Sequence, residues 1–211
     1  METVLLHKSA FLYVTSIFRL SSFVFANALL TGITKTFVPF YSSFPKILCK
    51  TVQGLYNLAL FHQRIGIRIV VHKQTYKRLP QFADYIYHNF PFVAQVAFMQ
   101  METIGLAKEN FDQLWIDPYD YNMELREAVL LLADRGMKPY IYNAQLCVLP
   151  EDIRCYAQQS ISDWKDIYIP ECEGCVLRGQ CAGFFEANRN AHSSHIKKVE
   201  HISSDNRVLI N

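Results

Sequence analysis

Ile67-Arg-Ile-Val-Val-His72 is a run of β-branched residues long enough to form a buried strand. A helix-like pattern follows over residues 75–89, with Leu79-Pro80 in its first turn, and residues 92–99 form a second strand-like run. The order strand, helix, strand is typical of a parallel βα unit. The sequence therefore predicts an α/β fold built on a parallel sheet.

The alternation continues on both sides of this unit. Further elements are expected over residues 38–41 (strand), 51–65 (helix), 108–115 (short helix), 117–135 (long helix, ending at Gly136) and 138–142 (strand). Only about four parallel strands are visible, which are too few to close a barrel and leave an exposed edge.

The bulk composition excludes some classes of protein. A chain of 211 residues with 51% hydrophobic residues can bury a substantial core, so it is not a disordered tail. Its 21 basic and 19 acidic residues are mixed along the chain, which gives no electrostatic case for nucleic acid. The uncharged stretches 9–18 and 20–34 are separated by Arg19, and neither approaches the roughly 20 residues of a membrane span. We therefore expect a cytoplasmic protein that binds neither nucleic acid nor membrane.

Polar residues follow the predicted strands. His72 follows the first strand, Gln100 and Glu102 the second, and Asn143 the last. Because ligands of parallel α/β folds bind at the carboxyl ends of the strands, these four residues are candidates to face a cofactor or a peptide. The alternative is that they are ordinary surface residues, since strand ends meet solvent.

A cysteine cluster lies near the C-terminus. Cys172-Glu-Gly-Cys175 is followed by Cys181, with Gly174, Gly179 and Gly183 between and after them, and a fourth candidate ligand, Cys147, lies upstream. Clustered thiols on glycine-containing loops are typical of a site for a soft metal. A disulfide framework fits less well, because such frameworks occur in shorter chains with distributed cysteines. Spacing alone leaves an iron–sulfur cluster and a four-cysteine zinc site equally open.

Several blocks together resemble one known family, the C component of the His-Xaa-Ser system radical SAM maturases. The blocks are Ile67–Pro80, Leu114–Tyr121, Tyr142–Leu149, Ser160–Lys165 and Cys172–Phe185. The resemblance implies an incomplete radical SAM type (β/α) barrel with a C-terminal cysteine-rich extension. It also implies that Cys147, Cys172, Cys175 and Cys181 hold an auxiliary [4Fe–4S] cluster, and that the partner is a precursor peptide with His-Xaa-Ser repeats. If the chain is a non-catalytic subunit, a radical SAM maturase is a further possible partner.

On this basis the chain divides into four segments. They are a non-matching hydrophobic segment (1–37), the partial barrel (38–143), the auxiliary-cluster extension (144–196) and a tail (197–211). His192 and His195 have a metal-like spacing, but two histidines in a polar stretch are more typical of a solvated loop.

The sequence also departs from the family pattern. Radical SAM enzymes bind S-adenosylmethionine on a cluster held by a CxxxCxxC loop, and here Cys49 is the only cysteine before Cys147. We therefore expect a truncated relative that retains the auxiliary cluster and makes no radical of its own. S-adenosylmethionine is a cofactor of the intact relatives, and the missing motif argues against its binding here. The alternative is a non-catalytic subunit that binds a peptide or partner and carries a structural zinc site made of the same four cysteines.

Overall fold

The computed structural model describes residues 18–20, 23–26, 44–159 and 167–201, with side chains from residue 51 onward. The strand expected over residues 38–41 lies outside these ranges, as does the side chain of Cys49.

The described strands form one sheet whose spatial order follows the order of the chain. They are β1 (Phe18–Leu20), β2 (Phe23–Ala26), β3 (Ile65–Val71), β4 (Gln95–Gln100), β5 (Pro139–Tyr142) and β6 (Ala157–Gln158). Strand β1 is antiparallel to β2, and every later pair is parallel. The prediction of an α/β fold with a parallel sheet is confirmed.

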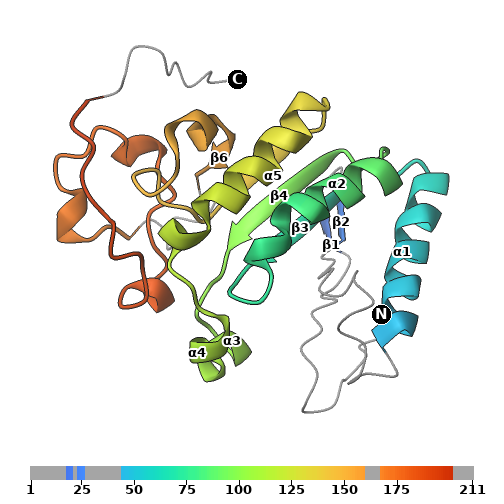
Figure 1. Ribbon diagram of the computed structural model, residues 1–211, viewed down its shortest axis with the longest axis horizontal. Helices are drawn as coiled ribbons and strands as arrows, with labels where there is room; N and C mark the ends of the chain where they lie inside the picture. Colours follow the sequence, from blue (N-terminus) through green and yellow to red (C-terminus); the bar gives the residue numbers. More distant parts are fainter. Residues whose placement is uncertain (1–17, 21–22, 27–43, 160–166, 202–211) are drawn as a thin grey trace.

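The helices lie between the strands. They are α1 (Phe44–Leu60), α2 (Leu79–Asn89), α3 (Leu106–Glu109), α4 (Phe111–Leu114) and α5 (Asn122–Asp134). Helices α2 and α5 pack side by side over one face of the sheet (Figure 1). This follows from the strand order, because successive right-handed crossovers in one direction leave their helices on the same face. Gly136 ends α5 with a φ of 76°, a left-handed conformation that glycine adopts without strain.

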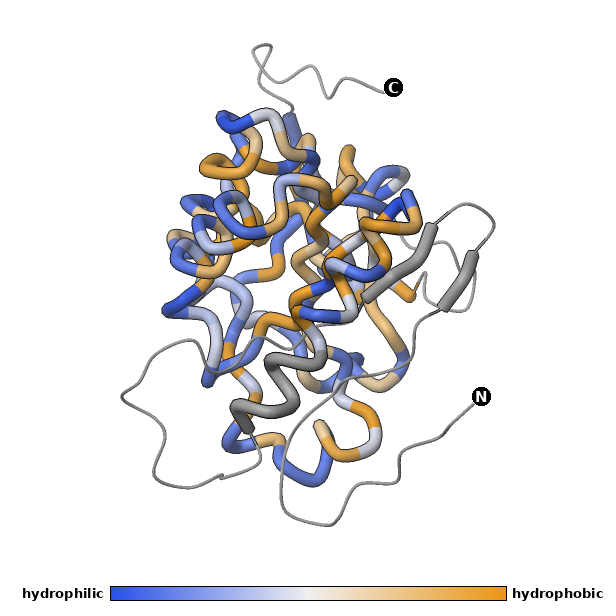
Figure 2. Tube along the Cα trace, turned by 90° about the vertical axis from the view of Figure 1, so that its right-hand side faces the viewer, coloured by the Kyte–Doolittle hydropathy of each residue, from blue (hydrophilic) through white to orange (hydrophobic). Residues whose placement is uncertain are grey.

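The register of the strands separates the two faces of the sheet. Ile67 pairs with Val96 and Ile69 pairs with Phe98, and all four side chains are buried in the core beneath the helices. The opposite face carries side chains that are mostly half-buried, among them Arg68, Met99, Tyr140 and Tyr142. Hydrophobic and hydrophilic residues alternate along the helices, which therefore turn an apolar side toward the sheet (Figure 2).

Several boundaries differ from the predictions. Strands β1, β2 and β6 were not expected, because runs of two to four residues carry no periodicity and depend on pairing with neighbours. Helix α1 begins seven residues before position 51, at Phe44, and ends at Leu60. The long helix expected from Asp117 begins instead with a 3-10 turn (Pro118–Tyr121), and α5 follows it.

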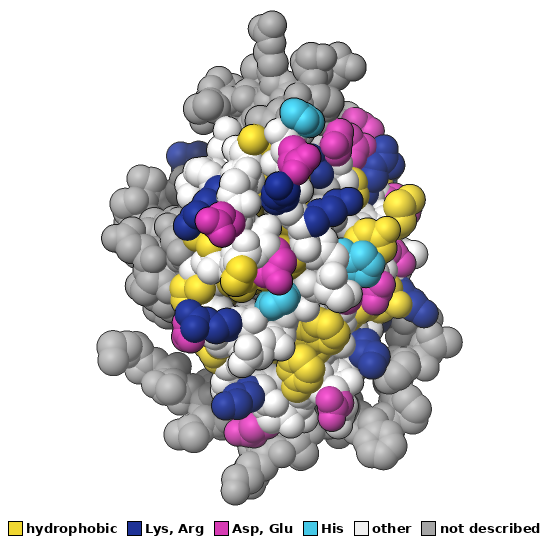
Figure 3. Space-filling model, turned by 90° about the vertical axis from the view of Figure 1, so that its left-hand side faces the viewer, with side chains coloured by type: hydrophobic (Ala, Val, Ile, Leu, Met, Phe, Trp, Pro, Cys, Tyr) yellow, Lys and Arg dark blue, Asp and Glu magenta, His cyan; other side chains and the backbone are white. Residues whose placement is uncertain are grey.

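The cysteine region, defined as residues 143–159 and 167–199, has little regular structure. Its short 3-10 turns are Glu151–Tyr156, Pro170–Cys172, Arg178–Gln180 and Glu186–Asn188. A β-bridge joins Ile167 to Phe184. On the face of the molecule shown in Figure 3, acidic, basic and histidine side chains are interspersed, with hydrophobic side chains between them.

Within the described residues, we find no helix with both the length and the apolar character needed to cross a membrane.

Candidate metal site and strand-end residues

The four cysteines come from two separate parts of the cysteine region. Cys147 lies in the loop that leaves β5, whereas Cys172 ends the first of the turns that follow residue 167. The Cys175 N–H donates to the Cys172 carbonyl over 3.2 Å, and Gly174 between them has a φ of +72°. A side chain would be strained in this left-handed conformation, so glycine lets the chain double back between the two thiols.

The structure brings the four thiols into one neighbourhood. Burial raises the pKa of the Cys147 thiol, and the thiols of Cys181, Cys172 and Cys175 raise it further. The Cys172 pKa is raised in the same way, by burial first and then by Cys181 and Cys175. Cys147 is therefore close enough to each of the other three to interact with their charge, although 25 residues separate it from the nearest of them in sequence (172 − 147).

Backbone N–H groups point at the sulfur atoms. The Val199 N–H donates to Cys175 Sγ over 3.4 Å. Lys197 contributes a backbone hydrogen bond to Cys147, and the backbone of Gly183, Leu146 and Ala182 contributes similar bonds to Cys181. Such bonds favour the thiolate form, which is the form that binds metal, and they tune the potential of metal–sulfur centres.

The four sulfur atoms lie near one another, but they are not arranged around a common metal position. In the described part of the chain, no three or more His, Cys, Asp or Glu side chains lie close enough together to hold a metal ion as they stand. The donor set nevertheless fits a soft metal, because it offers four thiols with backbone donors around them. The fifth described cysteine, Cys155, is exposed, and its sulfur lies 3.7 Å from the Asp152 carbonyl oxygen.

His72 is buried at the end of β3. Its Nδ1 accepts the Gln74 N–H over 3.3 Å, so the ring proton of the neutral form is on Nε2. Burial, followed by the nearby charge of Arg78, lowers the His72 pKa to about 4. His72 is therefore neutral at pH 7, and it forms hydrogen bonds with Gln74 and Thr75 in the turn that follows β3.

The ends of β4 and β5 are joined through side-chain amides. Asn143, with a φ of 63°, donates through Nδ2 to the Gln100 carbonyl over 3.4 Å. Gln145 donates to the Gly183 carbonyl over 2.8 Å, which connects the end of β5 to the loop after Cys181. The side-chain oxygens of Gln100 and Gln145 are buried and accept no hydrogen bond from the part of the chain that the structure describes. Of the four strand-end candidates, Gln100 and Asn143 are thus brought into direct contact, and Glu102 lies half-buried beside Gln100 in the chain.

Three further residues, which the sequence patterns did not indicate, connect the sheet to the cysteine region. Thr103 donates through Oγ1 to the Ala187 carbonyl over 2.6 Å, and its N–H donates to Asn188 Oδ1 over 3.0 Å. Asp117 accepts hydrogen bonds from Ser194. No sequence signal marks Thr103 or Asn188. Asp117 was recognisable only as the start of a helical turn, a role that it also has, since its Oδ1 accepts the Tyr119 N–H.

Two tyrosines on the face of the sheet opposite α2 and α5 were also missed. Burial raises the pKa of Tyr142, Arg68 opposes this, and Tyr140 adds to it. These three side chains lie on the strands β3 and β5, which flank β4. They form a polar and aromatic strip, because residues paired across neighbouring parallel strands share a face.

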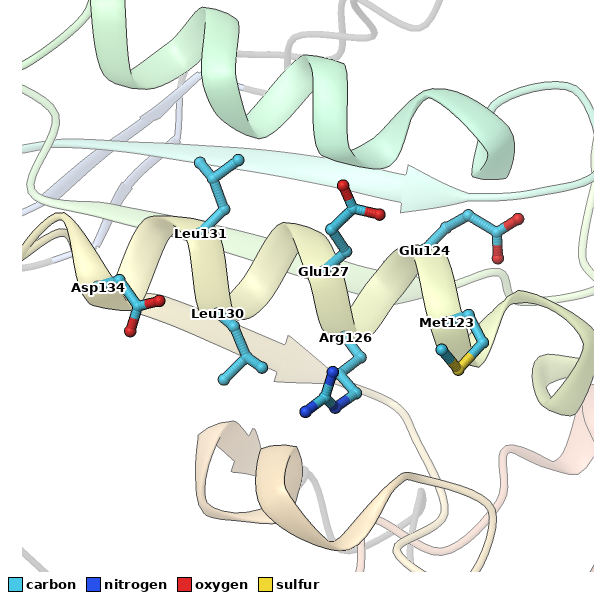
Figure 4. A pocket seen from close by; sticks show the side chains of 7 residues that line it. All are labelled: Met123, Glu124, Arg126, Glu127, Leu130, Leu131 and Asp134. Atoms are coloured by element: carbon cyan, nitrogen blue, oxygen red, sulfur yellow. The ribbon is translucent and has the colours of Figure 1, made fainter.

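A hollow runs along α5, away from the candidate residues. Its lining residues all belong to this helix: Met123, Glu124, Arg126, Glu127, Leu130, Leu131 and Asp134 (Figure 4). Arg126 is engaged by Asp152 at 2.6 Å. The hollow contains none of the cysteines or strand-end residues, so it gives no reason to place chemistry there.

Comparisons of the chain with models of protein families, with curated proteins and with solved structures found no match.

Proposed function

We propose that the cysteine region binds a metal–sulfur centre, a [4Fe–4S] cluster, through Cys147, Cys172, Cys175 and Cys181. The observation that carries this proposal is the electrostatic neighbourhood of Cys147, which includes all three of the other thiols. Four thiolates would saturate a cubane cluster, and buried neighbours such as Val148 and Phe184 would keep water from it.

The α/β unit would then resemble the incomplete barrel of a His-Xaa-Ser system radical SAM maturase. We propose that it binds a precursor peptide with His-Xaa-Ser repeats, alone or with a partner maturase. The amides at the ends of β4 and β5 support this, because the carboxyl ends of parallel strands are where such folds bind ligands, and leaving the buried oxygens of Gln100 and Gln145 without a donor from the described residues costs free energy.

We propose no independent radical chemistry for this sequence. It contains no CxxxCxxC motif, and a cluster with a cysteine on every iron has no open site for S-adenosylmethionine. Incubation of the reconstituted protein with S-adenosylmethionine and dithionite should therefore give no 5′-deoxyadenosine. Its formation above the level of a protein-free control would contradict this part of the proposal.

Anaerobic reconstitution with ferrous iron and sulfide tests the metal site. The expected product is one [4Fe–4S] cluster per chain, measured by iron and sulfide analysis and by the visible absorption of the cluster. Cys147→Ser should lose the cluster. Cys155→Ser is the matched control and should retain it, because Cys155 is exposed and lies outside the four-thiol neighbourhood. Equal cluster content in the two variants would reject the ligand assignment.

The second candidate is a structural four-cysteine zinc site in a non-catalytic binding subunit. The tight turn from Cys172 to Cys175, with its left-handed Gly174, supports this alternative equally well. Metal analysis of the protein purified anaerobically without reconstitution separates the two. Stoichiometric zinc that ferrous iron and sulfide do not displace would favour the zinc site and remove the cluster assignment.

A further inference from the structure

Asp117 fastens a distant segment of the chain to the turn before α5. Its Oδ2 accepts the Ser194 N–H over 3.0 Å and the Ser194 hydroxyl over 3.2 Å. The fully buried Ser193 also donates to this carboxylate, and its own Oγ accepts the His195 N–H over 3.1 Å. The His195 ring stacks on Tyr119 with centroids 3.8 Å apart. The stretch that the sequence suggested to be solvated loop is therefore held at several points.

The chain that leaves this anchor runs directly to the thiols. Lys197 contributes its backbone hydrogen bond to Cys147. Two residues later, the Val199 N–H donates to Cys175 Sγ, and the Val199 carbonyl accepts the Val176 N–H over 3.0 Å. One short segment thus contacts both parts of the chain that supply cysteines.

We infer that residues 193–199 form a strap, which Asp117 clamps at one end and which places backbone N–H groups on the sulfur atoms of Cys175 and Cys147. Asp117 is then a positioning residue for the proposed metal site, although its side chain touches no cysteine. The strap makes the electronic properties of that site depend on the turn before α5. This inference rests on the proposed function only where it concerns a bound metal, because the contacts exist in the metal-free chain.

Asp117→Asn is the substitution that isolates the clamp. Asparagine retains an oxygen that can accept the Tyr119 N–H, but it replaces the second oxygen by an NH2 group, which cannot accept from Ser194. Asp120→Asn is the matched control, since Asp120 is exposed in the same turn. Both variants are treated with iodoacetamide in the metal-free state, and the labelling rate of each cysteine is measured by mass spectrometry.

The N–H donors from the strap favour the thiolate, which is the form that iodoacetamide attacks. Release of the strap should therefore lower the labelling rates of Cys175 and Cys147 about fivefold, the factor expected for the loss of a typical hydrogen bond. The buried Cys181 and the exposed Cys155 should keep their rates, because the strap contacts neither. Rates at Cys175 and Cys147 that stay unchanged or rise in Asp117→Asn, with Cys181 unchanged, would overturn the inference. A rise that includes Cys181 would indicate general unfolding instead.

If Asp117→Asn unfolds generally, Val199→Pro tests the strap instead, because proline lacks the N–H that reaches Cys175. Lys198→Pro is its control. A selective fall in the labelling rate of Cys175 in Val199→Pro supports the strap, and its absence rejects it.

In protein that has accepted a cluster, Asp117→Asn should also lower the midpoint potential, since N–H···S bonds stabilise the reduced form. A protein that takes up no metal but shows the selective labelling would reject the proposed function and leave the strap standing.

Discussion

The α/β unit (residues 65–142) and the cysteine region are stabilised in different ways. In the α/β unit, strands and helices bury side chains such as Phe98 and Leu132 in one continuous core. This core extends into the cysteine region through Leu146, Ile153 and Leu177, but there irregular loops joined by single contacts, such as the one from Gln145 to Gly183, replace the strands and long helices. The α/β unit therefore combines burial with regular backbone hydrogen bonding, whereas the loops of the cysteine region combine burial with a few specific contacts. The cysteine region should therefore respond to metal and to single polar substitutions more than the α/β unit does.

The largest effect should come from Phe98→Ala in the middle of β4. Phe98 is 1% exposed, and removal of a buried aromatic ring costs about 3–5 kcal/mol. The free energy of unfolding, measured by urea denaturation, should fall by this amount. Phe61→Ala is the control, because Phe61 is 75% exposed and should change it little. Similar losses in the two variants would contradict the assigned core.

Acid should weaken the α/β unit through His72. Its pKa is about 4 in the folded protein against 6.5 when unfolded, so between these values only the unfolded state binds the proton. This contribution is complete above pH 6.5 and is lost as the pH falls toward 4, by about 3 kcal/mol. Urea denaturation from pH 7.5 to 4 should show this slope. His72→Gln should flatten this slope, and an unchanged slope in that variant would reject the assignment.

Metal should stabilise the cysteine region selectively. A ligand at one hundred times its dissociation constant adds about 2.7 kcal/mol of stability. With Zn²⁺ as the probe, hydrogen exchange should slow in residues 167–199 and hardly change in β3 and β4 at short exchange times. Cys172→Ser should abolish the effect. Equal slowing throughout the chain at those times would show that the two regions open together. It would contradict the expectation that the cysteine region responds to metal more than the α/β unit does.

The smallest effect concerns the junction of the two regions. Thr103→Val removes the hydroxyl that bonds the Ala187 carbonyl, at a cost of about 1 kcal/mol. Thr75→Val is matched to it, since Thr75 is equally buried but bonds within the α/β unit, to the His72 carbonyl. Hydrogen exchange near residue 188 should accelerate in Thr103→Val only. The same acceleration in both variants would mean that Thr103 does not join the regions specifically.

The difference between the regions also explains what the sequence could predict. Strands β3 and β4 and helix α2 follow from the spacing of apolar residues, because burial on one face imposes a period on the chain. The short strand β6 exists only through its pairing with β5, which no local pattern encodes. The boundary errors at α1 and α5 have the same origin, since helix ends depend on individual caps and turns.

For the candidate site, side-chain chemistry was visible in the sequence and backbone chemistry was not. The four cysteines could be recognised from their spacing, and the other three lie close enough to Cys147 to raise its pKa, while the metal site itself stays a prediction. The donors from Lys197 and Val199 could not be recognised, because every residue except proline carries an N–H. Their position follows from Asp117, about 80 residues away, and such long-range contacts leave no local trace in a single sequence.

The hydrogen bond from Val199 to Cys175 has a practical consequence for dissecting this protein. A version shortened after Ile196 would keep every cysteine and all of α5, yet it would lack the donors to two of the sulfur atoms. Its metal content could look normal while its colour and redox behaviour changed. Affinity tags and deletion endpoints should therefore be placed beyond Val199.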